Sequence, residues 1–169
     1  MSQLKKVNLL IWTILAVVKN LHHPKTQYLM SIIDQFSRFY TDLATMQVSE
    51  LENIYSTDVV FIDPIAEHNG LAAVEQYFSK LLKNAKYCEF DIHYKNPVAE
   101  QGYVVSWTMK FTSKRINKGR PVAVDGLTII NIQNDKIVFH RDYYDLGQML
   151  YEHIPMLGRI IKKIKRSMG

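Results

Sequence analysis

Apolar residues in the first half of the chain recur at the spacing of helices with one buried face. The first run covers residues 29–43, a short second helix is predicted near residues 49–55, and a third helix covers residues 71–83. Between the second and third helices lies VVFIDP, residues 59–64, an apolar strand that the proline ends. The inward positions of the first helix are Leu29, Ile32, Ile33, Phe36, Tyr40 and Leu43. This half therefore predicts the order helix, helix, strand, helix.

The second half alternates between apolar and polar positions, which is typical of strands with one buried face. Strands are predicted over residues 87–94, 103–113, 122–133 and 136–146. The segments between them are short enough for consecutive antiparallel hairpins. We therefore expect an α+β fold in which a curved antiparallel sheet wraps around the N-terminal helices. This cone-like arrangement leaves one pocket at its open end.

The two ends of the chain differ from this central domain, which we place at residues 30–150. Residues 1–29 form an apolar N-terminal extension, whose run of 12 apolar residues is too short to span a bilayer comfortably. It is interpreted as an added helix packed on the domain or on a membrane surface, or as a segment ahead of a physiological start at Met30. Residues 151–169 are predicted to form a basic amphipathic helix. That helix either contacts a membrane surface or a partner, or folds back on its own domain.

Composition and charge limit the class of protein. A chain of 169 residues with 47% hydrophobic residues can form one domain with a substantial core. The net charge of +5 comes from residues 156–169, which hold five basic residues and no acid, so we expect no nucleic-acid partner. The single cysteine, Cys88, is predicted to be part of the core. A single cysteine excludes an intrachain disulfide and is consistent with a cytoplasmic protein. A cytoplasmic protein that associates with a membrane is the alternative.

The first candidate for chemistry is Asp63, which follows the apolar strand that ends at Pro64. Burial at this position would raise the pKa of a carboxyl group and allow it to act as a base near neutral pH. The alternative is a structural aspartate that accepts hydrogen bonds within the turn before the proline. Both interpretations stay open at the level of the sequence, and the structural one is favoured.

The second candidate is FHRDYYDL, residues 139–146, where polar groups continue a buried strand. Alternation places His140, Asp142 and Tyr144 on one face, so a cavity on that side would receive an imidazole, a carboxylate and a phenol. The structural alternative is a satisfied pair formed by His140 and Asp142. The same pair could supply two metal ligands, but no third ligand has suitable spacing, so we expect no metal and no other cofactor.

The strand over residues 103–113 presents two different faces. Trp107, Met109 and Phe111 alternate with a polar set that includes Thr108 and Lys110. An outward stripe of large apolar side chains would form a partner surface, and on this basis we predict a homodimer. The polar set would then face the pocket.

The stretches YSTDVVFIDP, NGLAAVEQYF and KIVFHRDYYDL, together with the order of elements over residues 30–150, resemble the nuclear transport factor 2-like, or SnoaL-like, family. Its members include ketosteroid isomerase, limonene epoxide hydrolase and small polyketide cyclases. The resemblance implies a cone fold, a dimer and a small, largely apolar ligand. Asp63 falls where ketosteroid isomerase has its proton-shuttling aspartate.

The resemblance assigns further positions. Asp142 matches the water-activating aspartate of limonene epoxide hydrolase and lies near the acid/base aspartate of the cyclases. Arginine and aspartate partners of that hydrolase would fall near Thr108 and Lys110, where this sequence has neither. The oxyanion tyrosine of the isomerase would fall near Phe39 or Tyr40, and its protonated aspartic acid would fall near Thr128. The predicted substrate-binding residues are Tyr40, Phe61, Thr108, Lys110, Thr128 and Tyr144.

Two functions follow from these patterns. The first is an isomerase, cyclase or hydratase/hydrolase that acts on a small hydrophobic molecule without a cofactor, with Asp63, Asp142 and His140 as catalytic residues. The second is a noncatalytic ligand-binding or accessory module that uses the same pocket. The fold does not choose between them, because one scaffold can carry many functions.

Overall fold

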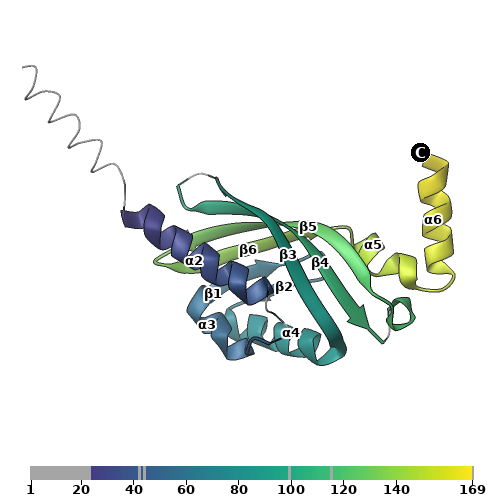
Figure 1. The fold of residues 1–169 in the computed structure, drawn as a ribbon, viewed down its shortest axis with the longest axis horizontal. Helices are drawn as coiled ribbons and strands as arrows, with labels where there is room; N and C mark the ends of the chain where they lie inside the picture. The colour runs from purple at the N-terminus through teal and green to yellow at the C-terminus, as the bar shows by residue number, and fades with distance from the viewer. Residues whose placement is uncertain (1–23, 42, 44, 99, 115, 169) are drawn as a thin grey trace, which may run out of the picture.

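The computed structural model describes residues 24–168, apart from 42, 44, 99 and 115, and confirms the predicted α+β fold class (Figure 1). Most of the predicted N-terminal extension lies outside the described residues. The helices are α2 (Pro24–Thr41), η1 (Val48–Glu50), α3 (Leu51–Ile54), α4 (Leu71–Asn84), η2 (Asn117–Gly119), α5 (Leu146–Met149), η3 (Tyr151–His153) and α6 (Leu157–Met168). The strands are β1 (Tyr55–Ile62), β2 (Glu67–Asn69), β3 (Ala85–Val98), β4 (Gly102–Ser113), β5 (Val122–Gln133) and β6 (Lys136–Tyr144).

The strands form a six-stranded sheet in the order β2-β1-β6-β5-β4-β3. The hairpin series β3-β4-β5-β6 is antiparallel, as the short connections predict. Strand β1, however, joins β6 in a parallel pair in which Phe61 lies opposite His140, so the sheet is mixed. Strand β2 is an addition to the predicted set and pairs antiparallel with β1 at the sheet edge. The parallel pair brings two segments that are distant in sequence side by side.

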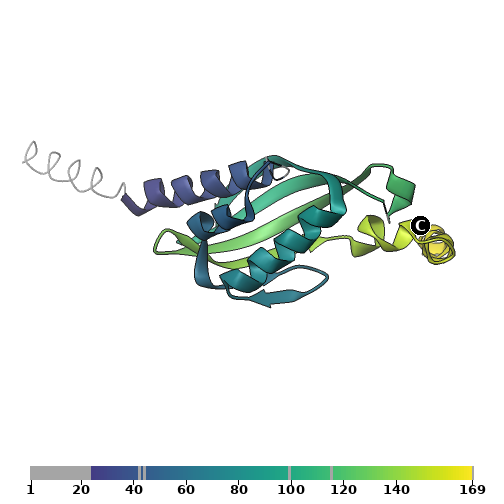
Figure 2. The same cartoon turned by 90° about the horizontal axis from the view of Figure 1, so that it is seen from below.

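Helices α2, α3 and α4 cover one face of the curved sheet (Figure 2). The apolar face of α2 is buried there, since Phe36 and Tyr40 are at most 5% exposed. Strand β5 alternates as predicted: Val124, Thr128 and Ile130 are buried, whereas Asp125 and Leu127 are exposed. The core therefore lies between the helices and this inner face, and the outer face of the sheet carries most of the polar positions.

Strand β4 turns its apolar stripe inward, so the outward stripe predicted from the sequence is wrong. Trp107 is 3% exposed and Phe111 is 8% exposed. Gly126 of β5 lies opposite Trp107, and a Cβ atom there would come within 2.2 Å of the indole Cη2. The glycine thus makes room for the indole on the inner face. The outward stripe therefore no longer supports the predicted homodimer, which stays an untested prediction.

After β6 the chain continues through α5 and η3 into α6, which lies at the end of the molecule opposite α2 (Figures 1 and 2). Helix α6 is a separate element at the periphery and carries all five basic residues of the segment 156–169. Within the described part of the chain, no helix is both long and apolar enough to cross a membrane.

Candidate functional site

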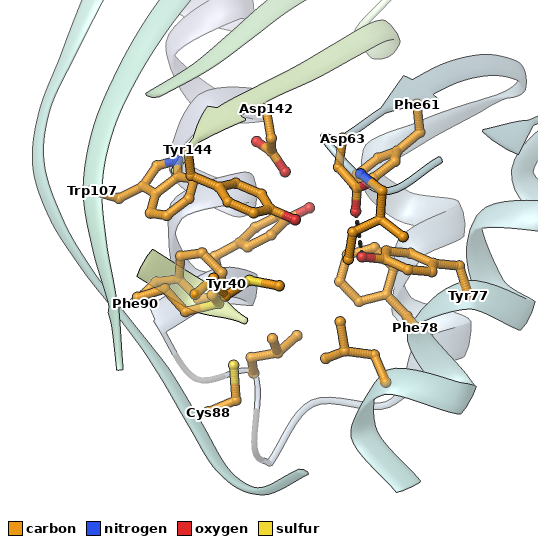
Figure 3. Close-up of a pocket in the computed structure, with 15 residues that line it drawn as sticks. Tyr40, Phe61, Asp63, Tyr77, Phe78, Cys88, Phe90, Trp107, Asp142 and Tyr144 are labelled. Atoms are coloured by element: carbon orange, nitrogen blue, oxygen red, sulfur yellow. Dashed lines mark hydrogen bonds between the residues drawn. The ribbon is translucent and has the colours of Figure 1, made fainter. Parts of the chain in front are cut away.

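A cavity of about 80 Å³ lies between the inner face of the sheet and helices α2 and α4 (Figure 3). Its wall is mostly aromatic and aliphatic, with two carboxylates and three phenols. The lining residues are Tyr40, Leu43, Phe61, Asp63, Ile65, Tyr77, Phe78, Leu81, Cys88, Phe90, Trp107, Met109, Asp142, Tyr144 and Met149. A largely apolar lining with a few convergent polar groups is typical of a small-molecule site, and the volume is below the roughly 300–1,000 Å³ of sites for drug-sized ligands, so the cavity suits a small molecule.

Asp142 reaches this cavity from β6 and is held by two donors behind it. The register of the β5–β6 pair places Thr128 directly opposite, and its hydroxyl donates to Asp142 Oδ1 at 2.5 Å. His140 Nε2 lies 2.9 Å from the same oxygen. Thr128 in turn accepts a hydrogen bond of 2.8 Å from the indole nitrogen of Trp107. Both hydrogen bonds fix one carboxylate oxygen and leave the side chain pointing toward the cavity, as Figure 3 shows.

His140 connects Asp142 to a chain of buried phenols. Its side chain is fully buried, and Phe61 stacks on the ring with centroids 4.2 Å apart. Tyr55 Oη lies 2.8 Å from His140 Nδ1 and 2.9 Å from Tyr40 Oη. As a carboxylate, Asp142 accepts from the Nε2 proton, so Nδ1 of the neutral imidazole accepts from Tyr55 and Tyr55 accepts from Tyr40. The chain of hydrogen bonds thus runs from the cavity wall at Tyr40 back to the carboxylate.

Asp63 faces the same cavity from the end of β1, and its carboxylate is also hydrogen-bonded. Oδ1 accepts from the backbone nitrogens of Ile65 and Ala66 at 2.7 and 2.8 Å. Oδ2 accepts from Tyr77 of α4 at 2.5 Å. The structural interpretation of this residue, an aspartate that caps its turn, is therefore correct, and the same side chain also lines the cavity. Three donors compensate for the burial of this carboxylate.

The phenols around the cavity remain protonated at physiological pH. Burial raises the pKa of Tyr77, and the neighbouring Asp63 raises it further. Burial likewise raises the pKa of Tyr144, with added contributions from Asp63 and Asp142. For Tyr40, burial is again the main cause of the raised pKa, followed by Tyr55. All three phenols therefore stay neutral and do not serve as bases. Tyr77 already donates its proton to Asp63 and Tyr40 donates to Tyr55, so Tyr144 is the phenol that can donate a hydrogen bond to a ligand.

The structure brings most of the predicted site residues together. Asp63, Asp142, Tyr40, Phe61 and Tyr144 line the cavity. Figure 3 shows Asp142 and Tyr144 on one side and Asp63 on the other. Two more predicted residues lie behind this wall rather than on it, and both contact Asp142. These are His140 and Thr128.

The predicted placement of Thr108 and Lys110 in the pocket is wrong, because both side chains lie on the outer face of β4. Thr108 donates to Asp125 at 2.6 Å, and Lys110 pairs with Asp91 at 2.5 Å, with both members of that pair about half exposed. Thr108 and Lys110 face outward because they alternate along β4 with Trp107 and Phe111, which face inward. Trp107 takes the inner position on this strand.

Three functional positions were missed by the sequence patterns: Tyr55, Tyr77 and Trp107. Tyr55 was assigned to the end of a short helix but begins β1, and its partner His140 is 85 residues away. Tyr77 lies on the inner side of the predicted third helix, so its helical spacing was a usable signal. Its bond to Asp63 joins residues 14 apart and follows only from the packing of α4 on β1.

Among the described residues, no cluster of three or more histidine, cysteine or acidic side chains is arranged to hold a metal ion. The cavity wall itself presents two carboxylate acceptors together with the hydroxyl of Tyr144 and the thiol of Cys88, while the indole N–H of Trp107 is donated to Thr128. This set can bind and orient a small polar group on an apolar ligand. It can also exchange a proton with that ligand through a carboxylate.

A mixed, open sheet that curves over helices and encloses such a cavity defines the class of nuclear transport factor 2-like cone proteins. The family model of the SnoaL-like domain matches residues 36–140, which is more than half of the chain. The chain therefore belongs to the SnoaL-like family. No curated protein matches it in sequence.

Solved structures support the fold at low sequence identity. A hypothetical protein with a ketosteroid isomerase-like fold from Catenulispora acidiphila is 15% identical, with a TM-score of 0.62 over 72% of this chain and 90% of that chain. A putative polyketide cyclase from Acidithiobacillus ferrooxidans is 17% identical, with a TM-score of 0.60 over 75% and 96%. An epoxide hydrolase of M. tuberculosis, similar to limonene epoxide hydrolase, is 13% identical, with a TM-score of 0.61 over 75% and 89%. At these identities the likeness concerns the fold alone.

Proposed function

We propose that this chain is an acid/base enzyme of the isomerase, cyclase or hydratase/hydrolase kind, which acts on a small hydrophobic substrate. The observation that carries the proposal is the position of Asp142, a carboxylate at the wall of an apolar cavity. It is held from behind by Thr128 and His140 through a single oxygen. A base fixed in this way is oriented before the substrate arrives, which reduces the cost of reaching the transition state.

In the proposed reaction, Asp142 removes a proton either from a substrate carbon next to a carbonyl group or from a water molecule that attacks the substrate. The cavity hydroxyl of Tyr144 is neutral, so it donates a hydrogen bond to the substrate oxygen on which negative charge develops. The proton then returns from Asp142 to a different substrate atom or is released with the product. The step consumes no oxidant or reductant.

The two remaining polar groups have supporting roles in this proposal. His140 is fully buried behind Asp142 and is a positioning residue, since it holds the carboxylate and links it to Tyr55. Asp63 already accepts three hydrogen bonds, and a carboxylate offers about four acceptor sites. It therefore has capacity for one further donor, such as a substrate hydroxyl across the cavity from Asp142. Asp63 thus orients the substrate as a second hydrogen-bond acceptor.

A noncatalytic binding module is the second candidate, and one observation favours it. Both carboxylates have internal donors, and the rest of the wall consists largely of aromatic and methionine side chains, as in a pocket built only for binding. In this case Asp142 would stabilise the fold and select ligands that donate a hydrogen bond. The two functions differ in whether the bound molecule exchanges a proton.

A solvent-exchange assay with simple probe molecules separates the two candidates and does not require the physiological substrate. Small cyclic ketones and epoxides that raise the melting temperature of the protein would first be selected as probes. Incorporation of deuterium next to the ketone carbonyl, or opening of the epoxide, would then be measured for the wild type and for Asp142→Asn. Asp125→Asn, on the outer sheet face, is the matched control.

The enzyme proposal expects the wild type and the control to turn over a bound probe. Asp142→Asn should retain binding and lose roughly a hundredfold or more in rate, which is the usual scale for loss of a positioned acid or base. Binding of several probes with no exchange or opening by the wild type would instead establish the binding module.

A further inference from the structure

Helix α6 contacts the rest of the protein through one edge. Gly158 packs on the backbone of Glu152, and a Cβ atom at this position would lie 2.2 Å from the carbonyl oxygen of Glu152. Two turns further along, Lys165 Nζ lies 3.0 Å from Asp145 and 2.6 Å from Glu152. Because residues 158 and 165 are seven apart, they lie on the same side of the helix. This edge fixes the orientation of α6 relative to the domain.

The apolar face of α6 is not the face that docks. Leu157, Ile160, Ile164 and Met168 recur at helical spacing and define one stripe along the helix, while Ile161 lies between this stripe and the docked edge and is half-buried. All four are exposed, by 39% at Leu157, 55% at Ile160, 52% at Ile164 and 83% at Met168. Met156, just before the helix, is 72% exposed and extends the patch. The alternative of a tail helix that buries its apolar side on its own domain does not fit this arrangement.

The opposite side of α6 is strongly basic. Arg159, Lys162, Lys163 and Arg166 lie on this side, whereas Lys165 lies on the docked edge with Asp145 and Glu152. Residues 156–169 contain no acid, and the remainder of the chain has equal numbers of basic and acidic residues. The entire net charge of the protein is therefore concentrated on this one helix. A helix with an exposed apolar stripe and basic side chains on its other side is complementary to an interface that combines negative charge with hydrocarbon.

We propose that α6 binds the surface of an anionic phospholipid bilayer. The apolar stripe, defined by Leu157, Ile160, Ile164 and Met168, enters the boundary between headgroups and acyl chains, and the basic side chains extend to the lipid phosphates. A second copy of the chain is a poorer occupant, since two helices that each carry Arg159, Lys162, Lys163 and Arg166 would repel one another. The docked edge at Gly158 and Lys165 leaves the stripe accessible to the membrane.

Attachment at this site would also orient the cavity. Met149 of α5 lines the cavity, and only the short element η3 separates α5 from α6. The protein would thus hold its cavity close to the bilayer, where small hydrophobic molecules accumulate. The membrane proposal itself is independent of whether the cavity is catalytic.

Vesicle flotation with the full chain tests the proposal. Vesicles of phosphatidylcholine alone are compared with vesicles that contain phosphatidylglycerol, at low and high ionic strength. We expect the wild type to float only with anionic vesicles, and the binding to fall as salt screens the charges. Lys162→Gln/Lys163→Gln should lower the partition coefficient roughly tenfold or more, on the basis of the usual contribution of a basic residue near an anionic surface.

The apolar stripe is tested separately by Ile160→Ser/Ile164→Ser, which should also reduce flotation at least tenfold because the hydrocarbon contact is lost. The matched controls are Leu127→Ser, at an exposed apolar position on β5, and Lys83→Gln/Lys114→Gln, which makes the same change of charge away from α6. Both controls should bind like the wild type. Circular dichroism would verify that each variant is folded.

Three outcomes would overturn the proposal. The first is failure of the wild type to float with anionic vesicles. The second is equal flotation of the α6 variants and the wild type, which would assign membrane binding to another part of the chain. The third is a lipid-free dimer in analytical ultracentrifugation that Ile160→Ser/Ile164→Ser converts to monomer, because the stripe would then be covered by a second copy.

Discussion

Replacement of Tyr55 by phenylalanine removes the one hydroxyl that joins the cavity wall to His140. The Tyr55 side chain is 1% exposed, and its hydroxyl lies between Tyr40 Oη and His140 Nδ1 at 2.9 and 2.8 Å. The aromatic ring, which also contacts Phe61, is retained in Tyr55→Phe. The change therefore leaves apolar packing in place and leaves two polar groups without this partner.

The magnitude follows from the energies of buried hydrogen bonds. A buried acceptor left without a donor costs about 1–3 kcal/mol, which applies to His140 Nδ1. Loss of the second hydrogen bond, at Tyr40, adds about 1 kcal/mol, since this hydroxyl also borders the cavity and can find another partner there. We expect Tyr55→Phe to lower the free energy of unfolding by about 2–4 kcal/mol.

Urea unfolding of three variants measures this effect and its coupling. Tyr40→Phe alone should cost about 1 kcal/mol, because Tyr55 can still donate to His140. The double variant should cost less than the sum of the two single variants, since it also removes the hydroxyl that Tyr55→Phe leaves unpaired. Tyr94→Phe, at a position 56% exposed, is the control and should change stability by less than about 0.5 kcal/mol.

Two results would refute this reasoning. A cost below about 0.5 kcal/mol for Tyr55→Phe would mean that the buried hydroxyl chain contributes little net stability. Strict additivity of the Tyr40 and Tyr55 substitutions would mean that the two phenols are not coupled through a shared hydrogen bond.

Three further predictions concern the cavity and the C-terminal helix. Gly126→Ala should displace the Trp107 indole and destabilise the protein by about 1–3 kcal/mol, measured by urea unfolding and tryptophan fluorescence; unchanged stability would contradict the close packing at this position. Burial raises the pKa of Cys88 to about 12, so labelling by a thiol reagent at pH 8 should be about a thousandfold slower in the native than in the unfolded protein, and rates within tenfold of each other would oppose a buried thiol. The hydrogen bond from Lys165 lowers the pKa of Asp145, so the contribution of this pair is complete above about pH 4 and is lost as the pH falls below it. The hydrogen-exchange protection of α6, corrected for intrinsic rates, should decline in this acidic range in the wild type, whereas Asp145→Asn should already show the lower protection at pH 7.

The sequence predicts those parts of the fold that depend on local periodicity and short connections. The α2 face that includes Phe36 and Tyr40, the three hairpins and the inner face of β5 all follow from spacing alone. The parallel pairing of β1 with β6 does not, because these strands lie at opposite ends of the domain sequence and no hairpin fixes their relative direction. Strand β2 is three residues long and partly exposed, so it has almost no apolar pattern to detect.

The candidate site was predictable to a similar degree. Alternation along β6 places His140, Asp142 and Tyr144 on one face, and the family resemblance adds Asp63. The orientation of β4 was not predictable from its own alternation, because both faces of that strand contain large or charged side chains. It depends on Gly126 of the neighbouring strand, which leaves room for Trp107 inside. Outside, Asp91 and Asp125 hydrogen-bond the polar set of β4.

A crystal structure with a bound probe would show directly whether the cavity binds a small hydrophobic ligand against Asp142. The probe would be a ketone or epoxide that raises the melting temperature of the wild type. We expect its reacting atom, or a water molecule beside it, to lie about 3 Å from Asp142 Oδ2, with the apolar part of the probe against Phe90 and Trp107. A probe bound outside this cavity, or one inside it whose reacting atom is out of reach of Asp142, would contradict this expectation.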